Sequence, residues 1–304
     1  MTDVPTEGPA FEAMMRGIDA KLKAEGVGIP SRPISAVGEV SIRYGDIPIP
    51  LGDGIVRGPP ELERYRPLAR AIRKWYDDTY GNRIKIDMSV GKIVLLLEGD
   101  LYALRIPQFF GSVNFTAQRE WIQKAQIGPG PGPATTNVVQ LVDGMTPGMA
   151  KSLSDEALLA IWSAFEIGLP ACYTLVSTQS ELVAIARNDV KMAVSNLMER
   201  HDHFGASKWA SLQSAEKVLK AAIALKGARF KPVHDLEQLC HQLAGLGVAF
   251  DQAQLVVDIQ CSPKIRYGEE SCTREQALAA HQASLVLVNR LRNAGAGFEL
   301  GLGG

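Results

Sequence analysis

Between residues 206 and 226, hydrophobic side chains recur every three or four positions, which is the spacing of one face of an α-helix. Polar side chains occupy the opposite face, where Glu216 and Lys220 stand in the i,i+4 order that favours an ion pair. Gly227 ends this pattern, and a second helix is predicted to begin at residues 234–236 after a basic loop. Two other segments have helical spacing: 181–200 and 273–293.

The first 165 or so residues mix two periodicities. Three stretches have the spacing of helices: 11–25, 61–80 and 153–168. Strands are predicted where apolar residues alternate or cluster between glycines and prolines: 34–56, 84–90, 92–98, 101–107 and 137–142. Gly91 and Gly99-Asp100 separate three of these strands at hairpin distances, and the Gly/Pro-rich segment 127–133 predicts a loop or hinge.

A chain of 304 residues is long enough for two domains with a sizeable core. We predict an α+β fold in which a mixed strand-and-helix domain, residues 1–170, precedes an all-helical bundle, residues 171–296. Residues 1–30 are expected to be partly disordered or a helical lead-in, and residues 297–304 a flexible tail.

The composition restricts the class of protein. Apolar content of 46% and a net charge of −1 are ordinary for a globular protein, so any contact with RNA requires a local basic patch. The four cysteines have no CxxC spacing, which favours free thiols in a reducing cytoplasm over disulfides or a metal site. No apolar run approaches the roughly 18 residues that span a bilayer, and the N-terminus lacks signal-peptide features. We therefore expect a cytoplasmic protein that binds no membrane, metal or other cofactor.

Several motifs in the C-terminal third occur in a distinctive order. The run Leu212–Ala221 (LQSAEKVLKA) is followed by Leu225-Lys226-Gly227 and then by Val233-His234-Asp235-Leu236. Together with Ala186-Arg187-Asn188-Asp189 on the preceding helix, this order resembles the HEPN family over about residues 180–293. The resemblance implies a small all-helical module of the kind found with nucleotidyltransferases, in toxin–antitoxin pairs and in RNA-cutting defence systems. The N-terminal domain resembles no family that we recognise.

The resemblance points to one pair of candidate catalytic residues, Arg274 and His281. Many RNA-cutting HEPN domains carry an Arg and a His, separated by four to six residues, at the start of the last core helix. Here the separation puts both side chains on nearly the same helix face, roughly 10 Å apart along the axis. In such a site the His is the acid or base, the Arg stabilises phosphate charge, and no metal is needed.

A structural role for this pair remains open. His281 shares its helical stripe with Leu278 and Leu285, as a core or interface histidine would. The carboxylate of Glu275, next to Arg274, would repel phosphate. The pattern is also not unique, because Arg229 and His234 match it with four intervening residues.

The resemblance also implies a face that binds nucleotide or RNA. The candidate residues are Glu216, Lys217, Lys220, Arg229, Lys231, His234, Arg266 and Tyr267. The loop cations precede a helix whose first amides could receive a phosphate. The alternatives are a solvated helix face for the first three residues, helix capping by Asp235, and simple packing of Tyr267. In the N-terminal domain, the basic and aromatic residues of 64–80 predict either a nucleic-acid face or a solvated face above the core.

Three functions are compatible with these observations. The first is a HEPN-like module that binds nucleotide or RNA, or acts in assembly, as a homodimer fused to a ligand- or partner-recognition domain. The second is a metal-independent endoribonuclease of the toxin or defence type that uses Arg274 and His281. The third is a purely structural oligomer.

Overall fold

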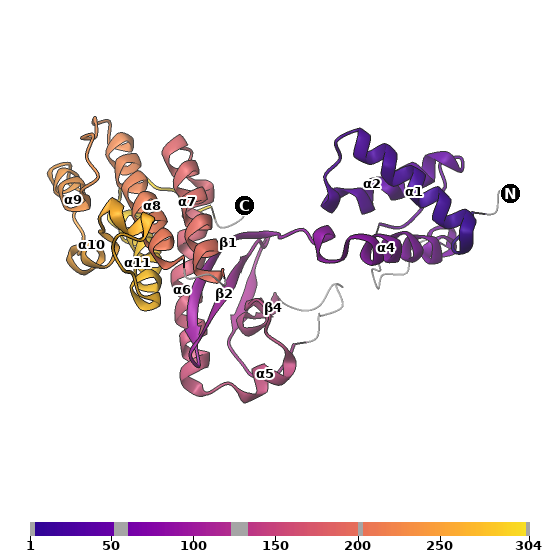
Figure 1. Cartoon of the computed structure of the whole chain (residues 1–304), viewed down its shortest axis with the longest axis horizontal. Helices are drawn as coiled ribbons and strands as arrows, with labels where there is room; N and C mark the ends of the chain where they lie inside the picture. Colours follow the sequence, from indigo (N-terminus) through magenta and orange to yellow (C-terminus); the bar gives the residue numbers. More distant parts are fainter. Residues whose placement is uncertain (1–3, 52–59, 123–132, 200–202, 302–304) are drawn as a thin grey trace. The chain divides into compact units, whose positions relative to one another are not determined.

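The computed structural model describes residues 4–51, 60–122, 133–199 and 203–301 (Figure 1). These residues form two compact units, the first ending at Asp87 and the second beginning at Met88. The sequence had placed the domain boundary at 170/171. The structure divides the chain earlier because the strands after residue 88 pack on helices of the second unit and share its hydrophobic core.

The described residues of the first unit form the α-helices α1 (Gly8–Ala24), α2 (Arg32–Arg43), α3 (Pro60–Arg64) and α4 (Arg66–Tyr80), with short 3-10 helices at Ile29–Ser31 and Gly81–Ile84. The helices expected at 11–25 and 61–80 are confirmed, the latter with a break at Tyr65. The strand expected at 34–56 is wrong over its first part, where α2 forms. Ala36 and Val40 bury one helical face in the core of this unit, and this packing outweighs the β-propensity of the segment. Residues 52–59 lie outside the described part.

The second unit begins with a hairpin of β1 (Ser89–Leu97) and β2 (Asp100–Pro107), antiparallel as the sequence predicted. Glu98 and Gly99 both have positive φ, as a tight two-residue turn requires. No separate strand forms at 84–90, and the break expected at Gly91 is absent, because β1 runs from Ser89 through Gly91 as one strand. A second pair, β3 (Val113–Thr116) and β4 (Ala134–Asn137), is parallel.

Two further predictions concern the segment around β4. The strand expected at 137–142 is instead a short 3-10 helix, η3 (Val138–Leu141), because the Asn137 side chain accepts a hydrogen bond from the Val139 amide and caps it. The Gly/Pro-rich loop expected at 127–133 lies, up to residue 132, outside the described residues.

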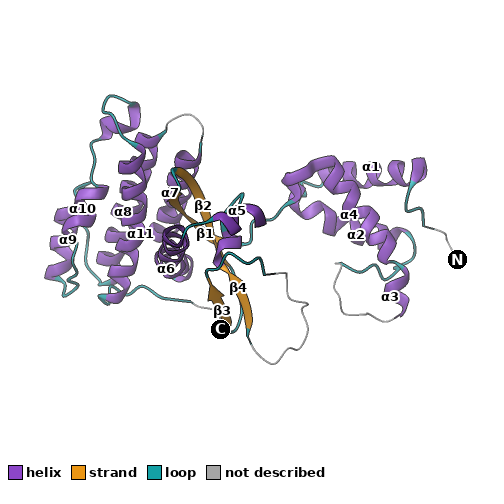
Figure 2. Cartoon of the chain, turned by 90° about the horizontal axis from the view of Figure 1, so that it is seen from below, coloured by secondary structure: helices purple, strands orange, loops and turns teal. Residues whose placement is uncertain are grey.

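The remaining chain is helical. It comprises α5 (Pro147–Ser152), α6 (Asp155–Ser177), α7 (Glu181–Met198), α8 (Phe204–Leu225), α9 (Leu236–Gly245), α10 (Ala253–Ile259), η4 (Pro263–Tyr267) and α11 (Arg274–Asn293). The four helices expected from residue 181 onward are confirmed. Helices α7 and α11 pack on α8, while α9 and α10 lie on the side away from the strands (Figures 1 and 2). The fold class of the chain is therefore α+β.

Helix α6 is longer than expected. The sequence predicts a helix over 153–168, yet α6 continues through Pro170 to Ser177. A proline inside a helix costs roughly 3 kcal/mol, but the turns beyond it bury Ala171, Cys172 and Tyr173. Because the helix continues, an 18-residue window of α6 reaches a mean hydropathy of 1.4, which meets the length and composition of a membrane span. Half of that window is buried inside the structure, and helices in the core of globular proteins can meet the same test.

Candidate functional site

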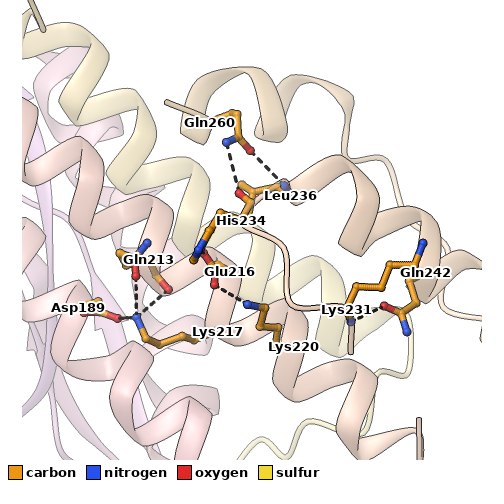
Figure 3. A network of polar contacts seen from close by, with 10 residues as sticks. All are labelled: Asp189, Gln213, Glu216, Lys217, Lys220, Lys231, His234, Leu236, Gln242 and Gln260. Atoms are coloured by element: carbon orange, nitrogen blue, oxygen red, sulfur yellow. Dashed lines mark hydrogen bonds and ion pairs between the residues drawn. The ribbon is translucent and has the colours of Figure 1, made fainter. Parts of the chain in front are cut away.

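A polar network joins α7, α8 and the loop before α9 (Figure 3). At its centre is Glu216 on α8, whose side chain is only 7% exposed. One carboxylate oxygen, Oε1, accepts a hydrogen bond from Lys220 Nζ at 2.6 Å. The other, Oε2, lies 2.8 Å from His234 Nδ1. The i,i+4 pair expected from the sequence therefore exists, but on a largely buried helix face and with a histidine from the next loop as a third member.

Lys217 extends the network toward α7. Its Nζ lies 2.7 Å from Asp189 Oδ2 and also contacts Gln213 on its own helix. Since both side chains of the Lys217–Asp189 pair are about four-fifths buried, the pair links α7 to α8. The charges of Lys217 and Lys220 are thus each matched by a carboxylate within the domain.

Two glutamines hold the loop between α8 and α9. Gln242 Nε2 donates to the carbonyl oxygen of Arg229, and Gln242 Oε1 accepts from the Lys231 amide. Gln260 Nε2 donates to the His234 carbonyl and its Oε1 accepts from the Leu236 amide. The sequence did not indicate either glutamine, because both lie outside the motifs and act through space.

The first amides of α9 are already occupied. Asp235 caps the helix by accepting from the Gln238 amide, and this hydrogen bond is the main cause of the lowered pKa of its carboxyl group. With the Leu236 amide bound to Gln260, the alternative of a structural cap fits better than a phosphate site at this helix start. The side chains of Arg229 and Lys231 are exposed, as is 39% of Phe230, whose ring lies 5.6 Å from Lys220 Nζ.

Arg266 and Tyr267 lie on η4 and are not members of this network. Tyr267 is 70% exposed, and the guanidinium of Arg266 lies 5.7 Å from its ring. The packing role considered for Tyr267 is therefore not observed.

Arg274 and His281 on α11 also lie apart from the network, and both contact the β1–β2 hairpin. Arg274 Nη1 donates to the carbonyl oxygen of Gly99 at 2.8 Å. The Val94 amide donates to His281 Nε2 at 3.1 Å, while Gln282 Nε2 donates to the Val94 carbonyl. Arg274 thus binds the turn of the hairpin, whereas His281 and Gln282 satisfy the backbone groups of Val94 in β1.

His281 has the environment of a core histidine. It is completely buried, and burial lowers the pKa of its imidazole from 6.5 to about 4. Since Nε2 accepts a hydrogen bond, the proton of the neutral ring is on Nδ1, which has no partner among the described residues. The structural alternative left open by the sequence fits this geometry better than an acid or base in contact with substrate.

In the first unit, the aromatic residues considered as a nucleic-acid face are mostly core. Trp75 and Tyr76 are buried, and Tyr76 stacks on Tyr80. Among the described residues, no group of three or more His, Cys, Asp or Glu side chains lies close enough to hold a metal ion.

Comparison with known proteins identifies the helical part of the second unit. The family model of the HEPN domain matches residues 179–282, from the start of α7 into α11, whereas the N-terminal region matches no family model. No curated protein and no solved structure matches the chain. The C-terminal part is therefore a HEPN domain, as the motif order implied, and this assignment points to a nucleotide- or RNA-related function.

Proposed function

We propose that this protein binds RNA or nucleotide through the loop 226–234 of its HEPN domain and does not cut it. The observation that carries the proposal is a loop that exposes Arg229, Lys231 and His234 together with the ring of Phe230. Cations neutralise phosphates and an exposed aromatic ring can stack on a base, which is the combination used to bind single strands.

The loop is also ordered before any ligand arrives. Gln242 and Gln260 hold its backbone, and Glu216 holds His234. Because a preorganised loop loses little conformational entropy on binding, its few exposed charges have a larger effect on affinity. Arg266 and Tyr267 are a second exposed Arg–aromatic pair and extend the proposal to η4.

The ribonuclease alternative has less support. Arg274 is partly exposed, but His281 is enclosed and its Nε2 is occupied by the Val94 amide. A substrate phosphate would reach His281 only if the β1–β2 hairpin left α11.

The proposal also concerns the binding partners of each unit. HEPN domains commonly dimerise, and we propose a homodimer through the helical domain of this protein in the cytoplasm. For the first unit we propose recognition of a ligand or protein partner. A groove of 380 Å³ between α2 and α4, with Ile34 and Ile72 among its apolar lining residues, offers a surface for it.

The binding proposal predicts that the double variant Arg229→Ala/Lys231→Ala loses about tenfold or more in affinity for a fluorescently labelled single-stranded RNA. The slope of log affinity against log salt should also become shallower by about 1 to 2, since two phosphate contacts are lost. Fluorescence anisotropy at several salt concentrations measures both quantities.

The matched control is Lys151→Ala, which removes an exposed lysine from α5 in the same unit and should leave affinity unchanged. Equal affinity of the double variant and wild type would refute the loop as the binding face. The same samples, incubated in EDTA and run on a gel, report cleavage. RNA cut by wild type but not by His281→Ala would favour the ribonuclease, and no binding by any variant would favour a structural oligomer.

A further inference from the structure

The proton position on His234 follows from its neighbours. The carboxylate of Glu216 only accepts hydrogen bonds, and its Oε1 accepts one from Lys220 Nζ at 2.6 Å. The short contact between Glu216 Oε2 and His234 Nδ1 therefore requires a proton on Nδ1. In the neutral ring, Nε2 then carries a free lone pair, and 75% of the side chain is exposed to solvent.

An imidazole held in this way is prepared for attack on an electrophile. The carboxylate fixes the tautomer and the ring orientation, and it stabilises the positive charge that develops when Nε2 forms a bond. We propose that His234 is a phosphoryl-acceptor residue, modified at Nε2 by a small phosphoryl donor such as an acyl phosphate.

The bonding changes balance without a further reactant. The Nε2 lone pair forms a bond to phosphorus while the bond from phosphorus to the acyl oxygen breaks, and the carboxylate of the donor leaves with that electron pair. The positive charge of the phosphorylated ring is shared through the Nδ1 proton with Glu216. The exposed loop cations Arg229 and Lys231 supply positive charge for the incoming phosphoryl oxygens.

Among the histidines that the structure describes, His234 alone combines these features. His281 is buried with its Nε2 occupied. His203 lies with Nε2 3.6 Å from Glu199, whose carboxylate is half exposed. His241 is exposed on α9, and none of the hydrogen bonds described for the domain holds its ring.

The modification would also regulate the loop, an effect that rests on the proposed function. The phosphoryl group carries a charge of about −1.5 to −2, which outweighs the positive charge of the ring, so the modified residue would repel the phosphates of a bound nucleic acid. Phosphorylation of His234 would therefore release RNA from the loop.

The test incubates the full-length protein with acetyl phosphate at neutral pH. Phosphorylated residues are then located by mass spectrometry at alkaline pH, which preserves the nitrogen–phosphorus bond. We expect wild type to be modified at His234 about tenfold faster than at His241, because the charge-assisted hydrogen bond to Glu216 stabilises the transition state. His234→Asn should abolish this labelling, whereas the matched variant His241→Asn should leave it unchanged.

Glu216→Gln should reduce labelling of His234 by about tenfold, since the amide cannot stabilise the charged ring as the carboxylate does. Equal labelling of His234 and His241 in wild type would overturn the proposal, and this comparison requires no variant to fold. Anisotropy with the phosphorylated protein keeps the two proposals distinct. Labelling of His234 without any change in RNA affinity would refute the binding face alone, and RNA binding without selective labelling would refute the acceptor alone.

Discussion

Replacement of Gly205 by alanine is expected to destabilise the second unit by about 3 kcal/mol or more. Gly205 lies in the first turn of α8, where η4 crosses it. A Cβ atom at this position would be 2.1 Å from the carbonyl oxygen of Ile265 and 3.1 Å from its carbon. Both are backbone atoms, so no side-chain rotation relieves the clash and the two elements would have to separate.

The measurement is denaturant unfolding of wild type, Gly205→Ala and Gly245→Ala. Gly245, at the end of α9, has no atom within 4 Å of its would-be Cβ. Alanine at position 245 is expected to leave the free energy of unfolding unchanged or to raise it by up to about 1 kcal/mol, because it reduces the entropy of the unfolded chain. Equal unfolding free energies for the two variants would contradict the close approach of η4 to α8.

The second prediction is that His281 makes the protein sensitive to acid. Its folded pKa of about 4 is below the ordinary value of 6.5, so the folded state favours the neutral ring. Between pH 6.5 and 4 the unfolded state binds a proton that the folded state does not bind. The contribution of His281 to the free energy of unfolding is therefore fully present above pH 6.5. It is lost as the pH falls toward 4, and the total loss is about 3 kcal/mol.

His281→Gln isolates this effect. The glutamine amide oxygen can accept the hydrogen bond from the Val94 amide, but the side chain does not titrate. The difference in unfolding free energy between wild type and variant should therefore shift by about 3 kcal/mol in favour of the variant from pH 7 to pH 4. Carboxylates elsewhere titrate in both proteins and cancel. A difference that is independent of pH would mean that His281 is accessible to protons in the folded state, which would revive its catalytic role.

The local spacing of apolar and capping residues was sufficient to predict the helices of the HEPN domain. The apolar stripe of α8, the stop at Gly227 and the Asp235 cap are properties of residues within a few positions of one another. The β1–β2 hairpin was equally predictable, because its turn glycine and flanking apolar strands are contiguous. Segment 34–43 was mispredicted since β-branched residues and a glycine suggested a strand, while its partners in the core of the first unit are distant in sequence.

The features of the candidate site likewise include some that the sequence predicts and others that depend on the tertiary structure. The sequence by itself determined the α+β class and the HEPN motif order, and it predicted Glu216, Lys220 and His234 only as separate members of a longer set of candidate binding residues. Only the tertiary structure decided that Glu216 is buried between a lysine and a histidine, that Asp189 pairs with Lys217, and that the hairpin encloses His281. Spacing along a helix specifies which side chains share a face. Burial and charge pairing depend on which distant segment covers that face, and that is set by packing of the whole unit.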